Sequence, residues 1–231
     1  MVHQVGWRVG STDALDFWTD RLEVAGVEVD RDEGSLRFSD PEGLGHELRV
    51  DDTSDDPLIA DHPEVPKEHA LRGFDHVRAY SAAPDRSHHL LGALGFEREE
   101  GTESWEARGS RRGGFYFYDD PPAEPGIQGA GTVHHVAWGS SPEEHEAWRA
   151  VVAEGGGRPT PVIDRFYFKS IYFREPSGVL FEIATLGPGF TVDEPLESLG
   201  EKLSLPPDYE HLREQVEPKL TPIRNPRAVE A

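Results

Sequence analysis

The stretch TVHHVAWGS (Thr132–Ser140) opens the most informative part of the chain, and DRFYFKSIYFREPSGVLFEIATLGPGF (Asp164–Phe190) closes it. Both contain short apolar runs typical of strands, and one of them, LFEIA, carries a single charged residue, Glu182. Burying an unpaired carboxylate in a strand is costly, so Glu182 needs a partner. Because a His pair opens the other run, a divalent metal held together with histidine is the obvious partner.

The chain is strongly acidic. Of its 231 residues 44 are acidic and 23 are basic, which gives a formal charge of -21. This charge repels phosphate backbones and anionic lipids, so we expect binding neither to nucleic acid nor to membranes. The acidic residues are spread along the whole sequence, and the acidic, lysine-poor composition resembles that of halophilic proteins, in which molar salt screens self-repulsion. An ordinary acidic cytosolic protein is the alternative.

The sequence contains no cysteine, which excludes disulfides, thiolate catalysis and metal sites built on cysteine. No apolar run approaches the roughly 18 residues of a membrane span. The N-terminus lacks the basic-then-apolar pattern of a signal peptide. We therefore expect a soluble, cytoplasmic protein.

Three segments share one layout, in which a short apolar strand precedes a helix and further strands. In the first, Val2–Val9 is followed by a helix that Ser11 or Thr12 can cap and whose apolar face carries Leu15, Trp18 and Leu22. The other two helices are expected over Ser87–Leu94 and from Pro142 to about Glu154.

The repeat is closest between FSDPEGLGHEL (Phe38–Leu48) and FREPSGVLFEI (Phe173–Ile183). An acidic-Pro-x-Gly turn between two apolar runs predicts a hairpin, and Glu47 and Glu182 occupy the same place after it. The sequence thus predicts an α+β fold of repeated β-α-β-β-β modules that form half-open mixed-sheet barrels. The predicted domains are modules over residues 1–50, 71–120 and 131–190, followed by a tail with a short helix over residues 191–231.

The strand position just before the first valine holds Gln4, His76 and His135 in the three segments. Together with Glu182, the two histidines make a His/His/Glu set: His76, His135 and Glu182. Two imidazoles and one carboxylate leave coordination positions open, which is the ligand pattern of non-haem Fe(II) oxygenases.

These residues and the run from Gly131 to Pro207 resemble the C-terminal part of ring-cleaving dioxygenases of the vicinal-oxygen-chelate superfamily, which also includes glyoxalases and bleomycin-resistance proteins. The hydroquinone-type branch is the most similar, and the resemblance covers essentially the whole chain. It implies an extradiol-type enzyme that binds Fe(II), or alternatively Mn(II), and inserts both atoms of O2 into a small hydroquinone- or catechol-like aromatic substrate.

The resemblance also assigns roles to individual residues. His135 and Glu182 correspond to metal ligands, and His134, Arg165 and Tyr172 to residues that contact the substrate or the oxygen-derived species. Tyr172 is then a hydrogen-bond donor or acid, and Arg165 an anchor for a phenolate or carboxylate. The apolar walls of the substrate site would come from Phe166, Phe168 and Trp138.

This chain departs from the family pattern in one respect. Proteins of this branch have four modules, and the chain corresponds to the last three. If neighbouring modules pair, His76 is the third ligand; otherwise the absent first module or a partner chain supplies it. Because an odd number of modules leaves one without its partner, we expect a homodimer.

Simpler interpretations exist for each residue. Glu182 could pair with an arginine such as Arg165, His135 could be a core histidine, and His134 and Tyr172 could serve packing alone. For the whole chain, the alternatives to a dioxygenase are a non-catalytic module that binds an aromatic ligand and a metal-dependent isomerase or lyase of the glyoxalase type. Consumption of O2 separates the dioxygenase from both.

Overall fold

The computed structural model describes residues 1–124 and 126–223, and three successive groups of elements in it have the order strand, helix, strand, strand, strand. Residue 125 of the loop before the third group and residues 224–231 of the predicted tail lie outside the described part. The first group comprises β1 (Val2–Val9), α1 (Thr12–Val24), β2 (Val29–Arg31), β3 (Ser35–Ser39) and β4 (Gly45–Val50). The second comprises β5 (Phe74–Tyr80), η1 (Pro84–Ser87), α2 (His88–Ala93), β6 (Glu97–Arg98), β7 (Ser104–Arg108) and β8 (Gly113–Asp119). The third comprises β9 (Val136–Ser140), α3 (His145–Glu154), β10 (Ile163–Asp164), β11 (Lys169–Arg174) and β12 (Leu180–Thr185).

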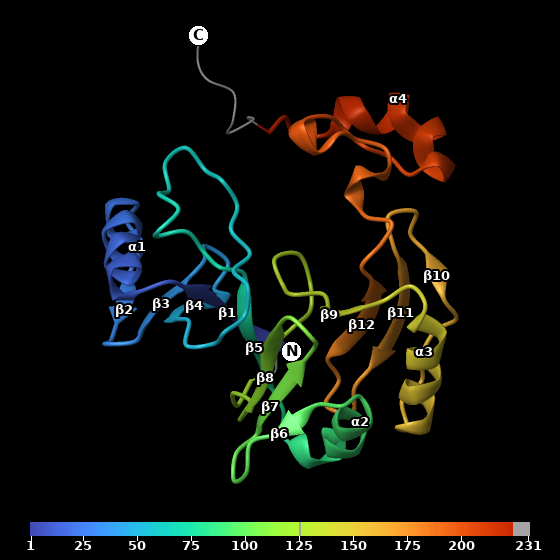
Figure 1. The fold of residues 1–231 in the computed structure, drawn as a ribbon, viewed down its shortest axis with the longest axis horizontal. Coiled ribbons are helices and arrows are strands. Elements are labelled where there is room, and N and C mark those ends of the chain that lie inside the picture. Colours follow the sequence, from blue (N-terminus) through green and yellow to red (C-terminus); the bar gives the residue numbers. More distant parts are fainter. Residues whose placement is uncertain (125, 224–231) are drawn as a thin grey trace.

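The first two groups share one eight-stranded sheet, with the order β2-β3-β4-β1-β5-β8-β7-β6. Within each group the first strand pairs in parallel with the last, as β1 does with β4 and β5 with β8. The two groups join where β1 pairs antiparallel with β5. The third group forms its own sheet, β10-β11-β12-β9, in which β9 again pairs in parallel with the last strand, β12. This mixture of helices and mixed sheets confirms the predicted α+β class, and Figure 1 shows the two sheets with their helices on the outside.

Helix α1 follows the sequence prediction closely. Ser11 is its N-cap, and the side-chain oxygen of Ser11 accepts a hydrogen bond from the backbone N–H of Ala14 at 3.2 Å. Such a cap satisfies one of the free N–H groups at the start of a helix. The predicted face packs into the core of the first group, where Leu15 is fully buried and Trp18 and Leu22 lie against it.

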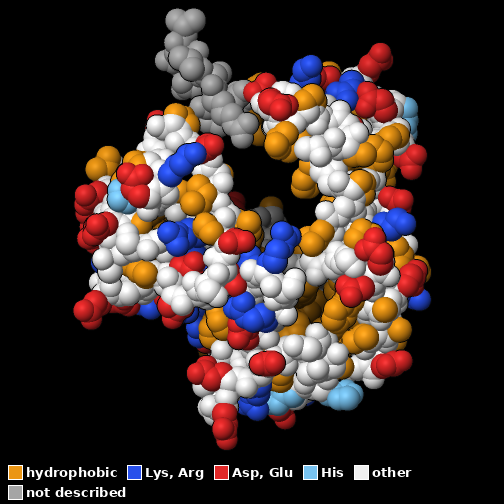
Figure 2. Space-filling model, in the orientation of Figure 1, with side chains coloured by type: hydrophobic (Ala, Val, Ile, Leu, Met, Phe, Trp, Pro, Cys, Tyr) orange, Lys and Arg blue, Asp and Glu red, His pale blue; other side chains and the backbone are white. Residues whose placement is uncertain are grey.

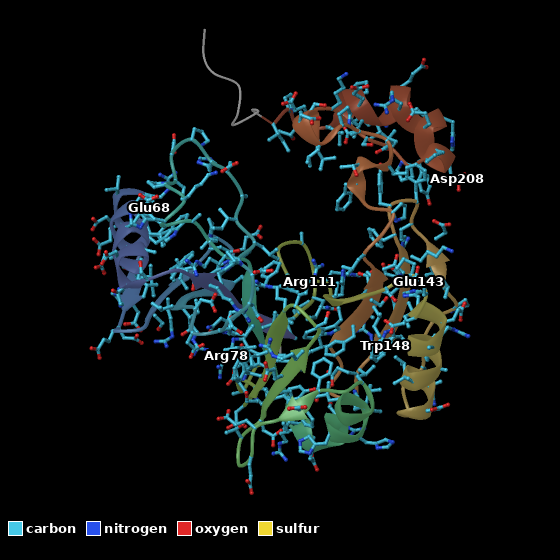
Figure 3. All side chains as sticks on the ribbon, viewed as in Figure 1. Glu68, Arg78, Arg111, Glu143, Trp148 and Asp208 are labelled. Atoms are coloured by element: carbon cyan, nitrogen blue, oxygen red, sulfur yellow. The ribbon has the colours of Figure 1, made fainter. Side chains whose placement is uncertain are left out.

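A larger core joins the second and third groups. Tyr116 of β8 and Phe181 of β12 are fully buried, and their rings meet edge to face with centroids 5.2 Å apart. Trp138 of β9 packs on the same core against Phe96. Trp148 of α3 lies against the four-stranded sheet (Figure 3). One face of that sheet is therefore committed to packing, which leaves the other face for chemistry.

The chain after β12 forms short helical turns that lie apart from the two sheets, at the top of Figure 1. They include the short helix predicted in this tail, α4 (Arg213–Val216). The other turns are η2 (Phe190–Val192), η3 (Leu196–Ser198), η4 (Pro207–Leu212) and η5 (Glu217–Lys219). None of the helices in the described residues is long and apolar enough to cross a membrane.

Candidate functional site

The candidate site lies on the face of the four-stranded sheet that is turned away from the core. Tyr172 of β11 lies directly opposite Glu182 of β12, and Glu182 pairs across the sheet with Ala137 of β9. Side chains two residues apart on a strand share a face. The same face therefore also carries Ser170, two residues before Tyr172, whereas Val136 and Trp138 point into the core.

His135 and Glu182 form the centre of this site. Nε2 of His135 lies 2.7 Å from Oε2 of Glu182. The hydroxyl of Ser170, which is fully buried, donates a hydrogen bond to the other carboxylate oxygen of Glu182. The Glu182 side chain is only 4 % exposed, whereas that of His135 is 33 % exposed. The carboxylate is thus fixed from behind by a serine and presents one oxygen to an accessible imidazole.

His134 belongs to the same group. Strand alternation predicts opposite faces for two successive residues. Both histidines precede β9, however, and their Nδ1 atoms lie 2.9 Å apart. This contact requires one of the two nitrogens to carry the proton and the other to accept it, so the tautomers of His134 and His135 are linked.

Tyr172 and Arg165 extend the site to the side. The ring of Tyr172 meets that of His135 edge to face with centroids 6.0 Å apart, and the guanidinium carbon of Arg165 lies 5.4 Å from the centroid of the Tyr172 ring. Successive contacts therefore connect five of the six predicted site residues: Arg165, Tyr172, His135, His134 and Glu182.

The loop that carries Arg165 has an unusual backbone. Phe166 has φ 70°, in the left-handed region that residues other than glycine seldom adopt. The N–H of Tyr167 bonds back to the carbonyl of Arg165 at 2.9 Å, and the Asp164 carboxylate accepts the N–H of Phe166 at 2.8 Å. Strained single residues of this kind gather at functional sites, where the surrounding structure holds them in place.

The structure places the sixth predicted residue, His76, in the other sheet. His76 lies on β5, with Nδ1 2.8 Å from Asp75 and Nε2 3.4 Å from Glu47 of β4. No group of three or more His, Cys, Asp or Glu side chains within residues 1–124 and 126–223 is arranged to hold a metal ion. The third group of elements therefore brings together one imidazole and one carboxylate of the predicted ligand set, and His76 sits with a different carboxylate.

The surroundings of His76 and Glu47 shift the pKa values of both. Burial disfavours the charge of the His76 ring, but the hydrogen bond to Asp75 and the attraction of the Asp75 and Glu47 carboxylates outweigh burial and raise the pKa of His76. Burial likewise opposes the charge of Glu47, but His76 and Arg37 outweigh it and lower the pKa of Glu47 to about 2.

Two features escaped sequence reasoning. Ser170 belongs to the site, and the period of two along β11 could have indicated it, because Ser170 and Tyr172 share a face. Trp138 does not belong to the site as one of its predicted walls, because it packs into the core against Phe96, Tyr116 and Phe181. The same alternation could have shown this, since Val136 and Trp138 share the face opposite to Ala137.

The donor set at His135 and Glu182 fits part of a first-row divalent metal site. Imidazole nitrogen and carboxylate oxygen are both ligands for Fe(II) and Mn(II). Nε2 of His135 and Oε2 of Glu182 lie side by side, so these two atoms would be the ones to hold such an ion. This sheet face thus offers two metal ligands, His135 and Glu182. A third ligand would have to come from another part of the protein or from a second chain.

Comparisons with known proteins show the family of the chain. Residues 73–183 match the model of the Glyoxalase/Bleomycin resistance protein/Dioxygenase superfamily. A Bacillus subtilis protein named "Putative ring-cleaving dioxygenase MhqA" is 36 % identical over 96 % of this chain and 76 % of its own length. The chlorohydroquinone/hydroquinone 1,2-dioxygenase of Sphingobium indicum is 31 % identical over 87 % of this chain and 67 % of its own length.

The fold comparison gives the same result over nearly the whole chain. A crystal structure from Bacillus subtilis, described as that of a "putative dioxygenase", superposes with a TM-score of 0.86 at 36 % identity. It covers 97 % of this chain and 74 % of the other. The chain therefore belongs to the Glyoxalase/Bleomycin resistance protein/Dioxygenase superfamily.

Proposed function

We propose that the chain is an Fe(II)-dependent ring-cleaving dioxygenase of the extradiol type, able to use Mn(II), that acts on a hydroquinone- or catechol-like aromatic with O2. The observation that carries this proposal is the contact of 2.7 Å between His135 and Glu182 on a sheet face that also holds Tyr172. The names of the relatives support the reaction class, because they describe ring-cleaving and hydroquinone dioxygenases.

In this proposal His135 and Glu182 would hold the metal, which when bound would supply a centre that brings substrate and O2 together. Ser170 keeps the Glu182 carboxylate oriented through its hydrogen bond. A buried carboxylate held in this way pays little to adopt its binding geometry, because its rotamer is already fixed.

The other residues act on the substrate and its protons. Arg165 lies at the outer edge of the group, where its guanidinium can orient a phenolate or carboxylate of the ring. The Tyr172 hydroxyl can donate a hydrogen bond to an oxygen atom of the substrate or of O2. Because the His134 and His135 rings are in contact through their Nδ1 atoms, His134 can accept a proton and return it. Phe166 and Phe168, in the loop beside Arg165, can provide the apolar walls.

The third metal ligand requires a donor from another module, and the strand pairing suggests where it enters. β1 and β5 pair antiparallel, and this pairing brings His76 of one group within 3.4 Å of Glu47 of the other. β9 corresponds to β1 and β5, and in the described residues β9 pairs only with β12. We propose that β9 of a second copy pairs here, so that the two copies present His135 and Glu182 to one shared ion.

The dimer has a distinct signature. Sedimentation in molar KCl should give a dimer once Fe(II) is present, with about one iron for every two chains because the ion is shared across the symmetry axis. A monomer that retains a full iron per chain would contradict the shared site but not the reaction.

The reaction itself is tested by O2 uptake. The chain is loaded anaerobically with Fe(II), hydroquinone or catechol is added, and O2 consumption is followed together with the ring-opened product. Glu182→Gln should retain the fold and lose both iron and O2 uptake, because an amide is a much weaker ligand than a carboxylate. The control is Glu103→Gln, since Glu103 forms a comparable His–Glu pair with His88 at 2.9 Å on the surface.

The outcomes separate the competing functions. Equal O2 uptake with a ring-opened product in wild type and Glu103→Gln, and none in Glu182→Gln, supports the proposal. Binding of the aromatic compound without O2 uptake would favour a non-catalytic binding module. Turnover that needs a thiol and consumes no O2 would favour a glyoxalase-type isomerase.

A further inference from the structure

The eight-stranded sheet contains a second cluster of metal-ligating side chains, which the proposed reaction does not use. Glu47, His76 and Gln4 meet where β1, β4 and β5 lie side by side. They line a pocket of about 590 Å³, and the other residues that line it include Phe117, Asp32, Arg37, Arg49 and Arg78. Arg78, labelled in Figure 3, projects from β5 beside this pocket.

His76 is the unusual member of this cluster. Its side chain is only 1 % exposed, and Nε2 is buried without a hydrogen-bond partner. Nε2 lies 3.4 Å from Oε2 of Glu47, a contact that does not meet hydrogen-bond geometry. Buried polar atoms usually have partners, so an unpartnered nitrogen of a residue that lines a pocket, beside a carboxylate, is a candidate metal donor.

The ring of His76 is held so that this nitrogen points toward Glu47, which also lines the pocket. Nδ1 bonds to the Asp75 carboxylate at 2.8 Å, and Phe117 meets the ring edge to face at 5.1 Å. On another side the ring rests against Gly6, where an added Cβ would lie 2.1 Å from Nδ1. A histidine that ligates a metal through one nitrogen characteristically donates the other N–H to a carboxylate, as His76 can to Asp75.

Glu47 and Gln4 complete the donor set. Oε1 of Glu47 accepts from Arg37 at 2.9 Å, which leaves Oε2 facing His76 and the Gln4 amide at 2.9 Å. The amide of Gln4 can rotate by half a turn to present its oxygen instead of its nitrogen. The Gln4 amide oxygen, Oε2 of Glu47 and Nε2 of His76 then converge. Their spacing of about 3 Å is that of ligands of one small divalent ion.

The charges around the pocket permit a cation. Each of its three arginines is paired with a carboxylate: Arg37 with Glu47 and Asp32, Arg49 with Asp75, and Arg78 with Asp119. A divalent ion at this site would therefore not face an unpaired guanidinium.

The internal repeat relates this cluster to the site on the other sheet. Gln4 and Glu47 stand in the same relation as His135 and Glu182, because Glu47 pairs with Gly6 and Glu182 with Ala137, each two residues after the first donor. The corresponding position on β8 is Phe117, which pairs with Arg78, two residues after His76. Two paired groups of elements thus offer four equivalent positions, here Gln4, Glu47, His76 and Phe117. The first three of them carry a side chain that can bind a metal.

We infer that Gln4, Glu47 and His76 form a second divalent-metal site, distinct from His135 and Glu182. The probe is Mn²⁺ alone, measured by calorimetry and by metal content after dialysis. The background is His135→Ala/Glu182→Gln, which removes the first site. This background should still bind about one Mn²⁺ per chain, and adding Glu47→Gln should weaken binding at least about 10-fold.

A gain of affinity makes the test independent of folding. Gln4→His supplies the imidazole found at position 135 and should tighten binding about 10-fold or more, because imidazole is a better ligand than an amide. The matched control in the same background is His88→Gln, which removes the surface His88–Glu103 pair and should leave binding unchanged.

Three results would overturn the inference. They are no Mn²⁺ binding in the background variant, equal weakening by Glu47→Gln and His88→Gln, and an unchanged or lower affinity in Gln4→His with an intact fold by circular dichroism. Loss of oxygenase activity in any of these variants has no bearing on the outcome, because the readout is bound metal.

Discussion

At the scale of single residues, the Tyr172 hydroxyl separates chemistry from packing. Replacing Tyr172 with Phe keeps the ring beside His135 at 6.0 Å and under Arg165, and removes only the hydroxyl. We expect Tyr172→Phe to bind iron as wild type does and to lose about 100-fold in kcat, since a positioned acid contributes about that much or more. Anaerobic iron binding and O2 uptake measure the two effects. An unchanged kcat would reduce Tyr172 to a strand aromatic.

Phe166 offers a second test at this scale, because its φ of 70° has a cost that depends on Cβ. Phe166→Ala and Phe166→Gly both remove the ring, but only glycine adopts this backbone without strain. We expect the glycine variant to be more stable than the alanine variant by about 1 kcal/mol in urea unfolding. Phe168, two residues on and without a positive φ, is the control: there the alanine variant should be the more stable one.

At the scale of elements, the sequence predicts the features that local patterns of residues determine, such as helix caps and the buried faces of helices and strands. Of the two predicted caps of α1, Ser11 and Thr12, the structure uses Ser11. The predicted apolar face of α1 and the position of Glu182 beside the first strand of its group are also confirmed. The third predicted helix begins at His145, three residues after Pro142. The second is α2, only six residues long, preceded by the short turn η1.

The sequence could not show which groups of elements share a sheet. The three groups have the same periodicity, so pattern alone cannot distinguish pairing of the first with the second from pairing of the second with the third. The β1–β5 pairing decides it, and it takes His76 to Glu47 rather than to His135 and Glu182. Long-range strand pairing depends on side-chain packing across the interface, which a single sequence does not reveal. The predicted domain boundaries and the full ligand set stay predictions.

Ion pairs between side chains connect the loop between β4 and β5 to the sheet. They lead to a prediction about how stability depends on pH. The fully buried Arg8 of β1 donates to Asp55 of this loop at 2.7 Å, and Arg108 of β7 reaches the same carboxylate at 2.8 Å. Burial would raise the pKa of Asp55, but the two arginines and the N–H of Gly113 outweigh burial and lower it well below its usual range.

A lowered folded-state pKa means that the charged form stabilises the fold. The contribution of Asp55 is therefore complete above the ordinary value of about 3.9 and is lost as the pH falls further toward the folded pKa. We expect Asp55→Asn to lower the urea midpoint clearly at about pH 7 and by less at about pH 3, because below about pH 3.9 the unfolded chain already binds the proton and the charge of Asp55 then stabilises the folded wild type less. Asn at the exposed Asp120 should change neither midpoint, and a pH-independent effect of Asp55→Asn would contradict the ionic role.

At the scale of the whole molecule, the dominant property is the charge of -21, which is spread over every segment. Figure 2 shows acidic side chains around the rim of the molecule, with Lys and Arg interspersed both at the rim and nearer its centre. Repulsion between exposed acidic groups opposes folding and the pairing of two copies alike. Salt weakens this repulsion, because the Debye length falls from about 10 Å at 0.1 M to about 3 Å at 1 M.

We therefore expect the urea midpoint to rise as KCl increases from about 0.1 M to about 2 M, because screening relieves repulsion between distant surface charges. Buried pairs such as Arg8–Asp55 are screened much less and cannot produce this dependence. Glu99 and Glu100, both exposed in one turn, provide the control: replacing both with lysine lowers the negative charge and should flatten the dependence on KCl. A flat response in the wild type would mean that the acidic surface is adapted to solubility alone. An equal slope in the lysine variant would mean that KCl acts through burial of apolar surface, which salt strengthens whatever the charge of the protein.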